Sequence, residues 1–402
     1  MKKILFDFVT LQVNAIWGGI LYTQKIFDEI LDKEVEIYGL YDGNMPINER
    51  IESITKQCKV TLLNIRDEYI FEIINNLRID TFFIGIAQSY GSFNLCALKC
   101  KVVIVCHDLN DMSLEYFKIL NAEPLKIFEE KYLINEISAR ACLIKKIKFF
   151  IKIFLYPLVL LRRYIRQKKF TLPVSRHANL EKLIKQPNVF VVTVSEYSKC
   201  SIQYFLGNPK NKIEVFYSPI VNENFDEKIE NFSKAEIKGK KYFLMLSVNR
   251  ACKNAILLLE QWERFCLSTN YEYYFVLVGK QIKVDLKNCI ALEEVASEEL
   301  AFLYKNAFAL VFPSFTEGFG YPPIEAAAYS TPSICANVTS IPEICGEMPI
   351  YFSPFYPEDL FRAMIKMTEN REFYVEKTKA RFLEIKQRQK QDLKKIIDFI
   401  LG

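Results

Sequence analysis

Two glutamates, Glu317 and Glu325, stand eight residues apart around a segment that holds two glycines and two prolines. The prolines follow Gly318 and Gly320, where an apolar run begins, and proline is favoured in the first turn of a helix. Glycines leave backbone N–H groups uncovered, and the N-terminus of the helix that follows is suited to phosphate. The pattern predicts a loop that holds a sugar at one carboxylate and a ribose at the other, with phosphates between them. The simpler interpretation is that Glu325 only adds a favourable negative charge to the first helical turn.

Arg250 and Lys253 lie between an apolar run that ends at Val248 and a helix-like segment that starts at Asn254. When a nucleoside diphosphate leaves, negative charge grows on its phosphate oxygens. Fixed cations aimed at these oxygens stabilise the transition state more than the ground state. A guanidinium suits bidentate phosphate contact, whereas a lysine ammonium acts as a point charge. On these residues alone, an exposed basic pair at the start of a helix is the alternative.

The first half of the chain offers two further candidates. Gly18 and Gly19 follow the first apolar run, and His107 with Asp108 stands at the end of a later one. A histidine at that strand end would point toward a ligand bound between two domains, although it could equally be a satisfied structural residue. A Gly-Gly pair after a strand is also typical of an ordinary turn. The other histidine of the chain, His177, has no motif around it.

Short apolar runs alternate with helix-length segments in both halves of the chain. In the first half, the candidate strands cover Lys3–Val9, Val35–Leu40, Thr81–Ile86, Val102–Cys106 and Val189–Val194. In the second half, they cover Tyr242–Val248, Tyr274–Gly279, Cys289–Leu292, Ala309–Pro313 and Ser333–Ala336. Such alternation is typical of parallel βαβ units, so we predict an α/β protein with two Rossmann-like domains facing each other across a cleft. Ligands of these sheets bind at the carboxyl ends of the strands.

The polar stretch Asn222–Lys241 marks the expected boundary between the two domains. We expect a first domain over residues 1–221, with a basic insertion at about 110–178, and a second domain over residues 222–385. The tail has a helical pattern, and residues 386–402 are expected to form a helix that packs back on the first domain.

The segment Glu317–Glu325 resembles the E-x7-E motif of glycosyltransferase family 4, whose members have the two-domain GT-B fold. The resemblance continues through Ser297–Leu300, Leu303–Ala307, Thr331–Ile334 and Ser340–Gly346. It covers about residues 189–370 well, and the first half of the chain only at points. The family resemblance therefore rests mainly on the second domain.

This resemblance implies a role for each candidate residue. Glu325 should hydrogen-bond the ribose hydroxyls of a nucleotide, and Glu317 should face the donor sugar. Arg250 and Lys253 should hold the diphosphate, and His107 should lie close to the sugar. The backbone that approaches the donor should belong to Gly18, Gly19, Gly318, Phe319 and Gly320.

The resemblance also implies the reaction, which is the retaining transfer of a hexose-type sugar from a UDP- or GDP-sugar. The implied acceptor is a glycan or lipid-linked glycan of bacterial surface polysaccharide or lipopolysaccharide synthesis. No metal or other cofactor is expected, and the sequence has no DxD motif flanked by apolar residues. Same-face substitution, in which the leaving phosphate accepts the acceptor's proton, needs no protein base, so Glu317 is not assigned as a nucleophile. Ser195 matches the family's VSxxS turn and is expected to cap the helix that follows.

Positive charge is concentrated in one segment of the chain. Residues 137–180 contain eleven Lys and Arg residues and no Asp or Glu, although the net charge of the whole chain is only +5. Within this segment, residues 143–170 combine apolar residues at helical spacing with lysines on another side, a pattern that suits an anionic membrane surface. A core-packed helix with a solvated basic face is the alternative, and the insertion is also a candidate for acceptor binding. No nucleic-acid motif accompanies the charge, so nucleic acid is not an expected partner.

Composition favours a cytoplasmic protein, with peripheral contact to the inner face of the plasma membrane through residues 143–170. The eleven cysteines form no CxxC pair, and Asp7 interrupts the N-terminal apolar run. No apolar run reaches the roughly 20 residues of a membrane-spanning helix. Two other functions stay open: a non-catalytic nucleotide-sugar-binding partner in glycan assembly, and a sugar-nucleotide epimerase or phosphorylase of related fold. A dinucleotide oxidoreductase is disfavoured, because no strand is followed by GxGxxG.

Overall fold

The computed structural model describes most of the chain outside the basic insertion. The described residues are 1–13, 18–57, 60–90, 95–110, 112, 179–220, 237–248, 250–279, 284, 286–293 and 295–402. The predicted amphipathic segment 143–170, the residue His177 and residues 222–236 of the expected linker lie outside these ranges.

The first domain is built on a seven-stranded sheet whose neighbouring strands are all parallel. In spatial order, the strands are β3 (Thr61–Asn64), β2 (Val35–Tyr41), β1 (Lys2–Asp7), β4 (Thr81–Ile84), β5 (Lys101–Val105), β6 (Val189–Thr193) and β7 (Glu214–Val215). The described helices are α1 (Phe8–Gln12), α2 (Gly18–Leu31), α3 (Glu49–Lys56), α4 (Ile70–Asn76) and α10 (Glu196–Leu206), with short 3-10 turns at Ala87–Tyr90 and Leu95–Ala97. The strand order reverses between β1 and β4, which is where doubly wound sheets bind ligands.

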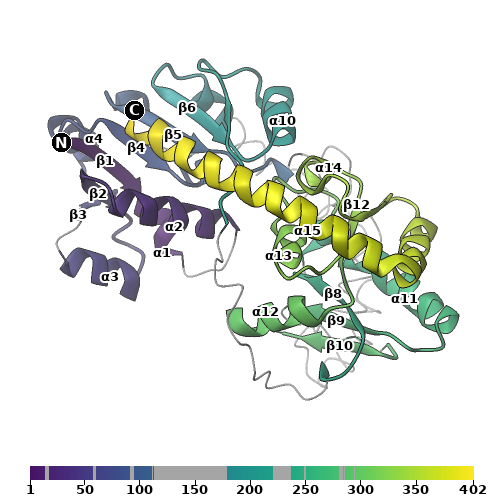
Figure 1. Cartoon of the computed structure of the whole chain (residues 1–402). Helices are drawn as coiled ribbons and strands as arrows, with labels where there is room; N and C mark the ends of the chain where they lie inside the picture. Colours follow the sequence, from purple (N-terminus) through teal and green to yellow (C-terminus); the bar gives the residue numbers. More distant parts are fainter. Residues whose placement is uncertain are drawn as a thin grey trace, which may run out of the picture.

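The second domain is built on a six-stranded parallel sheet. In spatial order, its strands are β10 (Cys289–Leu292), β9 (Tyr274–Val278), β8 (Tyr242–Leu246), β11 (Ala309–Phe312), β12 (Ser333–Ala336) and β13 (Ile350–Phe352). Its described helices are the 3-10 turn η5 (Ala251–Lys253), α11 (Ala255–Ser268), α12 (Ser297–Asn306), α13 (Tyr321–Ala328), α14 (Ile341–Cys345) and α15 (Pro357–Leu401). Here the order reverses between β8 and β11, so both domains have the Rossmann-like arrangement. Figure 1 shows the strands of the two sheets in separate halves of the molecule.

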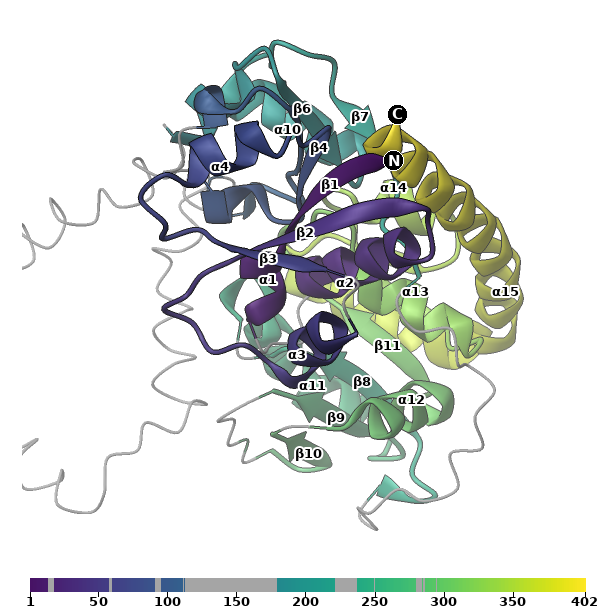
Figure 2. The same cartoon turned by 90° about the vertical axis from the view of Figure 1, so that its left-hand side faces the viewer.

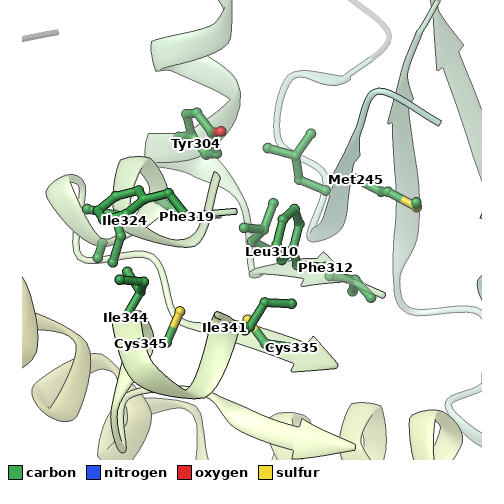
Figure 3. Close-up of a cluster of buried hydrophobic side chains, with 14 of the residues drawn as sticks. Met245, Tyr304, Leu310, Phe312, Phe319, Ile324, Cys335, Ile341, Ile344 and Cys345 are labelled. Atoms are coloured by element: carbon green, nitrogen blue, oxygen red, sulfur yellow. The ribbon is translucent and has the colours of Figure 1, made fainter. Parts of the chain in front are cut away.

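The central strands are buried on both faces, which explains their continuous apolar sequences. Every residue of β4, β11 and β12 is buried. In the second domain, Leu310 and Phe312 of β11 belong to one buried cluster with Ile324 of α13 and Ile341 of α14 (Figure 3). This cluster fixes α13, which carries Glu325, against the sheet that ends at the glycine loop.

Helix α15 joins the two domains. It packs on α11 and α13 of the second domain and reaches α2 and β4 of the first. Figures 1 and 2 show it running from the second domain to the first, so that the two chain ends lie close together. Near its end, the Lys101 ammonium of β5 donates to the Phe399 carbonyl and lies 4.0 Å from the centre of the Phe399 ring. The predicted return of a C-terminal helix to the first domain is confirmed.

Some element boundaries differ from the sequence prediction. The apolar run Lys3–Val9 predicts one strand, but β1 ends at Asp7 and α1 begins at Phe8. The Asp7 carboxylate accepts a hydrogen bond from the Thr10 backbone N–H at 2.9 Å and so caps this short helix. Strands β3, β7 and β13, which have four, two and three residues, are not among the strands predicted from the sequence. Within the described ranges, no helix has the length and apolar character that crossing a bilayer requires.

Candidate active site

Lys253 and Glu317 form a buried ion pair at the carboxyl ends of two neighbouring strands. Lys253 follows β8, and Glu317 follows β11, which lies next to β8 in the sheet. The distance from Lys253 Nζ to Glu317 Oε1 is 2.5 Å, and the two side chains are only 7% and 13% exposed. The Lys253 ammonium also lies 4.8 Å from the centre of the Phe312 ring. Two of the predicted site residues are therefore in direct contact. Each neutralises the charge of the other at a place that bulk water hardly reaches.

The turn that carries Lys253 is held by backbone hydrogen bonds. The Lys253 N–H donates to the Arg250 carbonyl at 2.9 Å and closes the 3-10 turn, and Asn254 then takes a left-handed conformation (φ 54°). The Phe315 N–H donates to the Cys252 carbonyl at 2.8 Å, which ties this turn to the loop after β11. The two predicted cations have different surroundings: Lys253 is buried, whereas Arg250 is exposed at the start of the turn.

Glu325 lies in α13 and bonds to Tyr304 of α12. Helix α13 begins at Tyr321 and has no acidic residue in its first turn, so the interpretation of Glu325 as a first-turn charge is wrong. The Tyr304 hydroxyl donates to Glu325 Oε2 at 2.6 Å. Burial raises the pKa of Glu325, while the hydrogen bond from Tyr304 and the positive charge of Lys253 oppose that rise. Lys253 therefore acts electrostatically on both motif glutamates.

Gly318 lies where the two domains touch. A Cβ atom at this position would be 2.2 Å from the His107 carbonyl oxygen and 2.9 Å from Asp108 Cβ. The Gly318 carbonyl accepts hydrogen bonds from Ser195 Oγ at 2.6 Å and from Ser198 Oγ at 3.2 Å. A glycine is needed here because the backbone of the first domain approaches it so closely.

The rest of the glycine loop shapes the start of α13. Gly320 precedes this helix with a φ of +86°, a left-handed conformation that favours glycine. Phe319 is buried, and the centre of its ring lies 5.7 Å from that of Tyr217 and 5.2 Å from that of Tyr321. The expected contact of the Gly318–Gly320 backbone with a donor stays a prediction.

A second contact between the domains surrounds the first turn of α10. Ser195 caps this helix by accepting from the Ser198 N–H at 3.1 Å, as predicted. Glu343 of α14 accepts from the backbone N–H groups of Glu196 at 2.8 Å and Tyr197 at 2.9 Å. A carboxylate is favourable there, because the free N–H groups and the helix dipole both attract negative charge. No local sequence pattern indicates this contact of Glu343, since its partners belong to a helix far away in the chain.

Gly18 and Gly19 begin α2 and lie close to other predicted site residues. A Cβ atom on Gly18 would be 3.2 Å from the Tyr321 ring of α13. A Cβ atom on Gly19 would be 3.4 Å from the His107 ring. The structure thus brings Gly19 and His107 together in the first domain, and places Gly18 against the helix that carries Glu325.

His107 is held as a neutral imidazole. Its Nε2 lies 3.0 Å from the Gly85 carbonyl oxygen, and because a carbonyl only accepts, we assign the proton to Nε2. Burial lowers the pKa of His107 to about 4, and the bond to Gly85 opposes this shift only in part. The Tyr22 ring packs edge-on against the imidazole, with 4.8 Å between the two ring centres. At pH 7, His107 can therefore orient a ligand through a hydrogen bond but does not supply a positive charge.

We expect NMR to show the His107 imidazole uncharged from pH 8 down to about pH 5. The chain has only two histidines, so a His177→Gln variant assigns both ring signals. Because the folded-state pKa lies below the ordinary value of 6.5, the unfolded chain binds the proton more readily below pH 6.5. Stability should therefore fall on acidification from pH 6.5 to about pH 4. A titration midpoint near 6.5 for His107 would contradict this environment.

The predicted residues thus form two groups, one at the ion pair and one at the contact between the domains. Lys253, Glu317 and Glu325 belong to the first group, and Gly19, His107 and Gly318 belong to the second. Among the described residues, no three His, Cys, Asp or Glu side chains are placed to hold a metal ion. The expected independence from metal and the assigned residue roles stay predictions.

Comparisons with known proteins concern mainly the second domain. Residues 226–388 match the family model described as glycosyl transferases group 1. The O-antigen chain mannosyltransferase RfbU of Salmonella typhimurium is 30% identical over 172 residues, which cover 41% of this chain and 46% of that protein. The O-antigen chain mannosyltransferase B of Escherichia coli is 27% identical over 180 residues, which cover 41% of this chain and 47% of that protein. This chain therefore spans about half the length of the curated relatives it matches.

A solved structure extends the likeness in fold to the whole chain. Anabaena Alr3699/HepE, in complex with UDP-glucose, has a TM-score of 0.62 and 13% sequence identity, with 100% of this chain and 98% of that chain covered. At this identity the likeness concerns the fold alone. Together with the two parallel sheets, it confirms the predicted GT-B fold.

Proposed function

We infer that this chain, whose residues 226–388 match the glycosyl transferases group 1 family model, is a glycosyltransferase of bacterial surface polysaccharide synthesis. Two relatives that match the same region are named O-antigen chain mannosyltransferases, which supports the polysaccharide context. The observation that carries the proposal is the buried Lys253–Glu317 pair, which also acts electrostatically on Glu325. A cation and two carboxylates there suit a ligand that contains a diphosphate, a sugar and a ribose.

In the proposed reaction, a hexose-type sugar moves from a UDP- or GDP-sugar to a glycan or lipid-linked glycan with retention of configuration. The bond from the anomeric carbon to the phosphate oxygen breaks as the acceptor oxygen bonds to the same face. The acceptor's proton passes to the departing phosphate, so no protein base and no metal is required. Lys253, joined by the exposed Arg250, offsets the charge that grows on the phosphates. Glu325 accepts hydrogen bonds from the ribose hydroxyls, and Glu317 faces the sugar.

Mannose is the first donor sugar to test, because two relatives are named mannosyltransferases. Glucose is the second, since UDP-glucose is bound in the Anabaena structure. For the acceptor side, we propose that the basic segment 143–170 contacts an anionic membrane at the cytoplasmic face and so approaches a lipid-linked acceptor. Vesicle sedimentation with and without anionic lipid tests this part separately.

A thermal-shift panel of UDP, GDP, UDP-glucose and GDP-mannose tests the donor assignment. A ligand that binds only the folded state, at 100 times its Kd, adds about 2.7 kcal/mol of apparent stability. We expect one base to raise the unfolding temperature clearly more than the other. No shift with any of the four would contradict the proposal.

Product analysis with acceptors then separates the alternative functions. Turnover that requires a separate acceptor supports a transferase, whereas conversion of the nucleotide sugar alone indicates an epimerase. Donor binding without turnover across acceptors indicates a non-catalytic binding partner. NMR of the product linkage distinguishes retention from inversion.

A further inference from the structure

Tyr304 is fixed along its whole length. It is only 2% exposed, and its hydroxyl donates to Glu325 Oε2 at 2.6 Å. Its backbone carbonyl accepts from Thr331 Oγ1 at 2.6 Å, and its ring is parallel to that of Tyr329 within 13°, with 6.2 Å between the ring centres. The hydroxyl of Tyr304 is therefore held in one place relative to α13.

The hydrogen bond from Tyr304 to Glu325 has a fixed direction. Burial, and then the negative charge of Glu325, raise the pKa of Tyr304 well above its usual value, so the phenol keeps its proton. The hydroxyl engages one lone pair of Oε2, which leaves Oε1 able to accept hydrogen bonds from a ligand. Burial alone favours the neutral form of Glu325, and the bond from Tyr304 favours the charged form. Tyr304 therefore makes Glu325 a better hydrogen-bond acceptor in two ways: it fixes the orientation of the carboxylate, and it favours the charged form.

We propose that Tyr304 is a positioning residue that orients the Glu325 carboxylate and thereby sets the preference of the donor site for ribonucleotides over deoxyribonucleotides. This inference rests on the proposed function, because it takes the nucleotide ribose as the ligand of Glu325. A site built to accept hydrogen bonds from ligand hydroxyls rejects an analogue that lacks them, since a buried acceptor is then left unpaired. If the Glu325 carboxylate loses its orientation, the ribonucleotide and the deoxyribonucleotide bind with similar affinity, and the preference for the ribonucleotide declines.

The test measures affinities for UDP and GDP and for their 2′-deoxy and 3′-deoxy forms by calorimetry. For the base that binds, we expect wild-type protein to prefer the ribonucleotide to at least one deoxy form by about 10- to 100-fold, the range for a hydrogen bond to a charged group. In Tyr304→Phe, this ratio should fall about tenfold, mainly because the ribonucleotide binds more weakly. Each ratio compares two ligands on one variant, so a general loss of stability does not change it.

Tyr242→Phe is the matched control. Tyr242 is 1% exposed, and its hydroxyl donates to the Leu303 carbonyl at 2.8 Å, one residue before Tyr304 in α12. The substitution removes the same atom from a buried tyrosine bonded to the same helix. Unlike Tyr304, Tyr242 donates to a backbone carbonyl rather than to Glu325. The ribose preference of Tyr242→Phe should equal that of the wild type.

A double-mutant cycle completes the test. Glu325→Gln should lower the preference by itself, and adding Tyr304→Phe should cause no further decrease, because the two side chains act through one bond. An unchanged ratio in Tyr304→Phe, or an equal decrease in Tyr242→Phe, would overturn the role of Tyr304 while leaving the proposed function intact. Absence of nucleotide binding by the wild-type protein would instead overturn the proposed function, and the role of Tyr304 with it.

Discussion

Replacing Lys253 by alanine is expected to lower donor turnover by about 100- to 1,000-fold, the range observed when one fixed charge-stabilising group is removed from an active site. Lys253 is only 6% exposed, so in the proposed reaction its ammonium acts on the departing diphosphate through little intervening water. The loss should lie mainly in kcat, since the leaving phosphate oxygens carry more negative charge in the transition state than in the bound donor. Steady-state kinetics with saturating donor and acceptor measure it.

The stability of this variant needs a separate control. Removing Lys253 leaves the Glu317 carboxylate, which is 13% exposed, without its counter-charge, and breaking a buried pair costs about 3–5 kcal/mol. Adding Glu317→Gln removes the unpaired charge and should recover stability without recovering turnover. Lys185→Ala, which breaks an exposed ion pair with Glu181 on the surface, should change neither. A folded Lys253→Ala protein with wild-type turnover would refute the assignment.

The sequence predicts the two members of this ion pair but not their contact. Lys253 and Glu317 were assigned to different parts of a ligand, and they are 64 residues apart in the chain. They meet because β8 and β11 are neighbours at the reversal of strand order, where adjacent parallel strands bring their carboxyl ends together. Apolar periodicity predicts that the two strands exist, whereas their pairing depends on the topology of the whole sheet.

Two contacts that no sequence pattern indicates share one property. Glu343 bonds to backbone N–H groups of α10, and Tyr304 bonds to a carboxylate of another helix. In both cases the partner lies on an element that is distant in the sequence, so a local pattern does not indicate it. The misplaced end of β1 has a local cause: Phe8 and Val9 continue the apolar run, yet Asp7 caps a helix. Capping chemistry overrode the apolar pattern there.

Replacing Gly318 by alanine is expected to lower kcat by about 100-fold or more, because the misplacement of reacting groups by 1 Å can cost that much. The new Cβ would lie 2.2 Å from the His107 carbonyl oxygen, which is backbone at the end of a buried strand and cannot rotate away. The two domains must therefore separate locally, with loss of the bonds from Ser195 and Ser198 to the Gly318 carbonyl. Small-angle scattering should show an increased radius of gyration.

Gly239→Ala is a control that separates the steric clash at Gly318 from the effect of backbone strain. Gly239 has a φ of +77°, and a Cβ atom there would meet nothing within 4 Å, so its substitution costs about 1 kcal/mol of conformational energy without any clash. Gly318 is the opposite case, since it is absent from the glycines with positive φ and its substitution acts only through the contact. We therefore expect Gly239→Ala to lower the unfolding temperature slightly with kcat unchanged, whereas Gly318→Ala should lower kcat. If Gly318→Ala kept both its compact shape and its kcat, close contact between the domains at this loop would not be required for transfer.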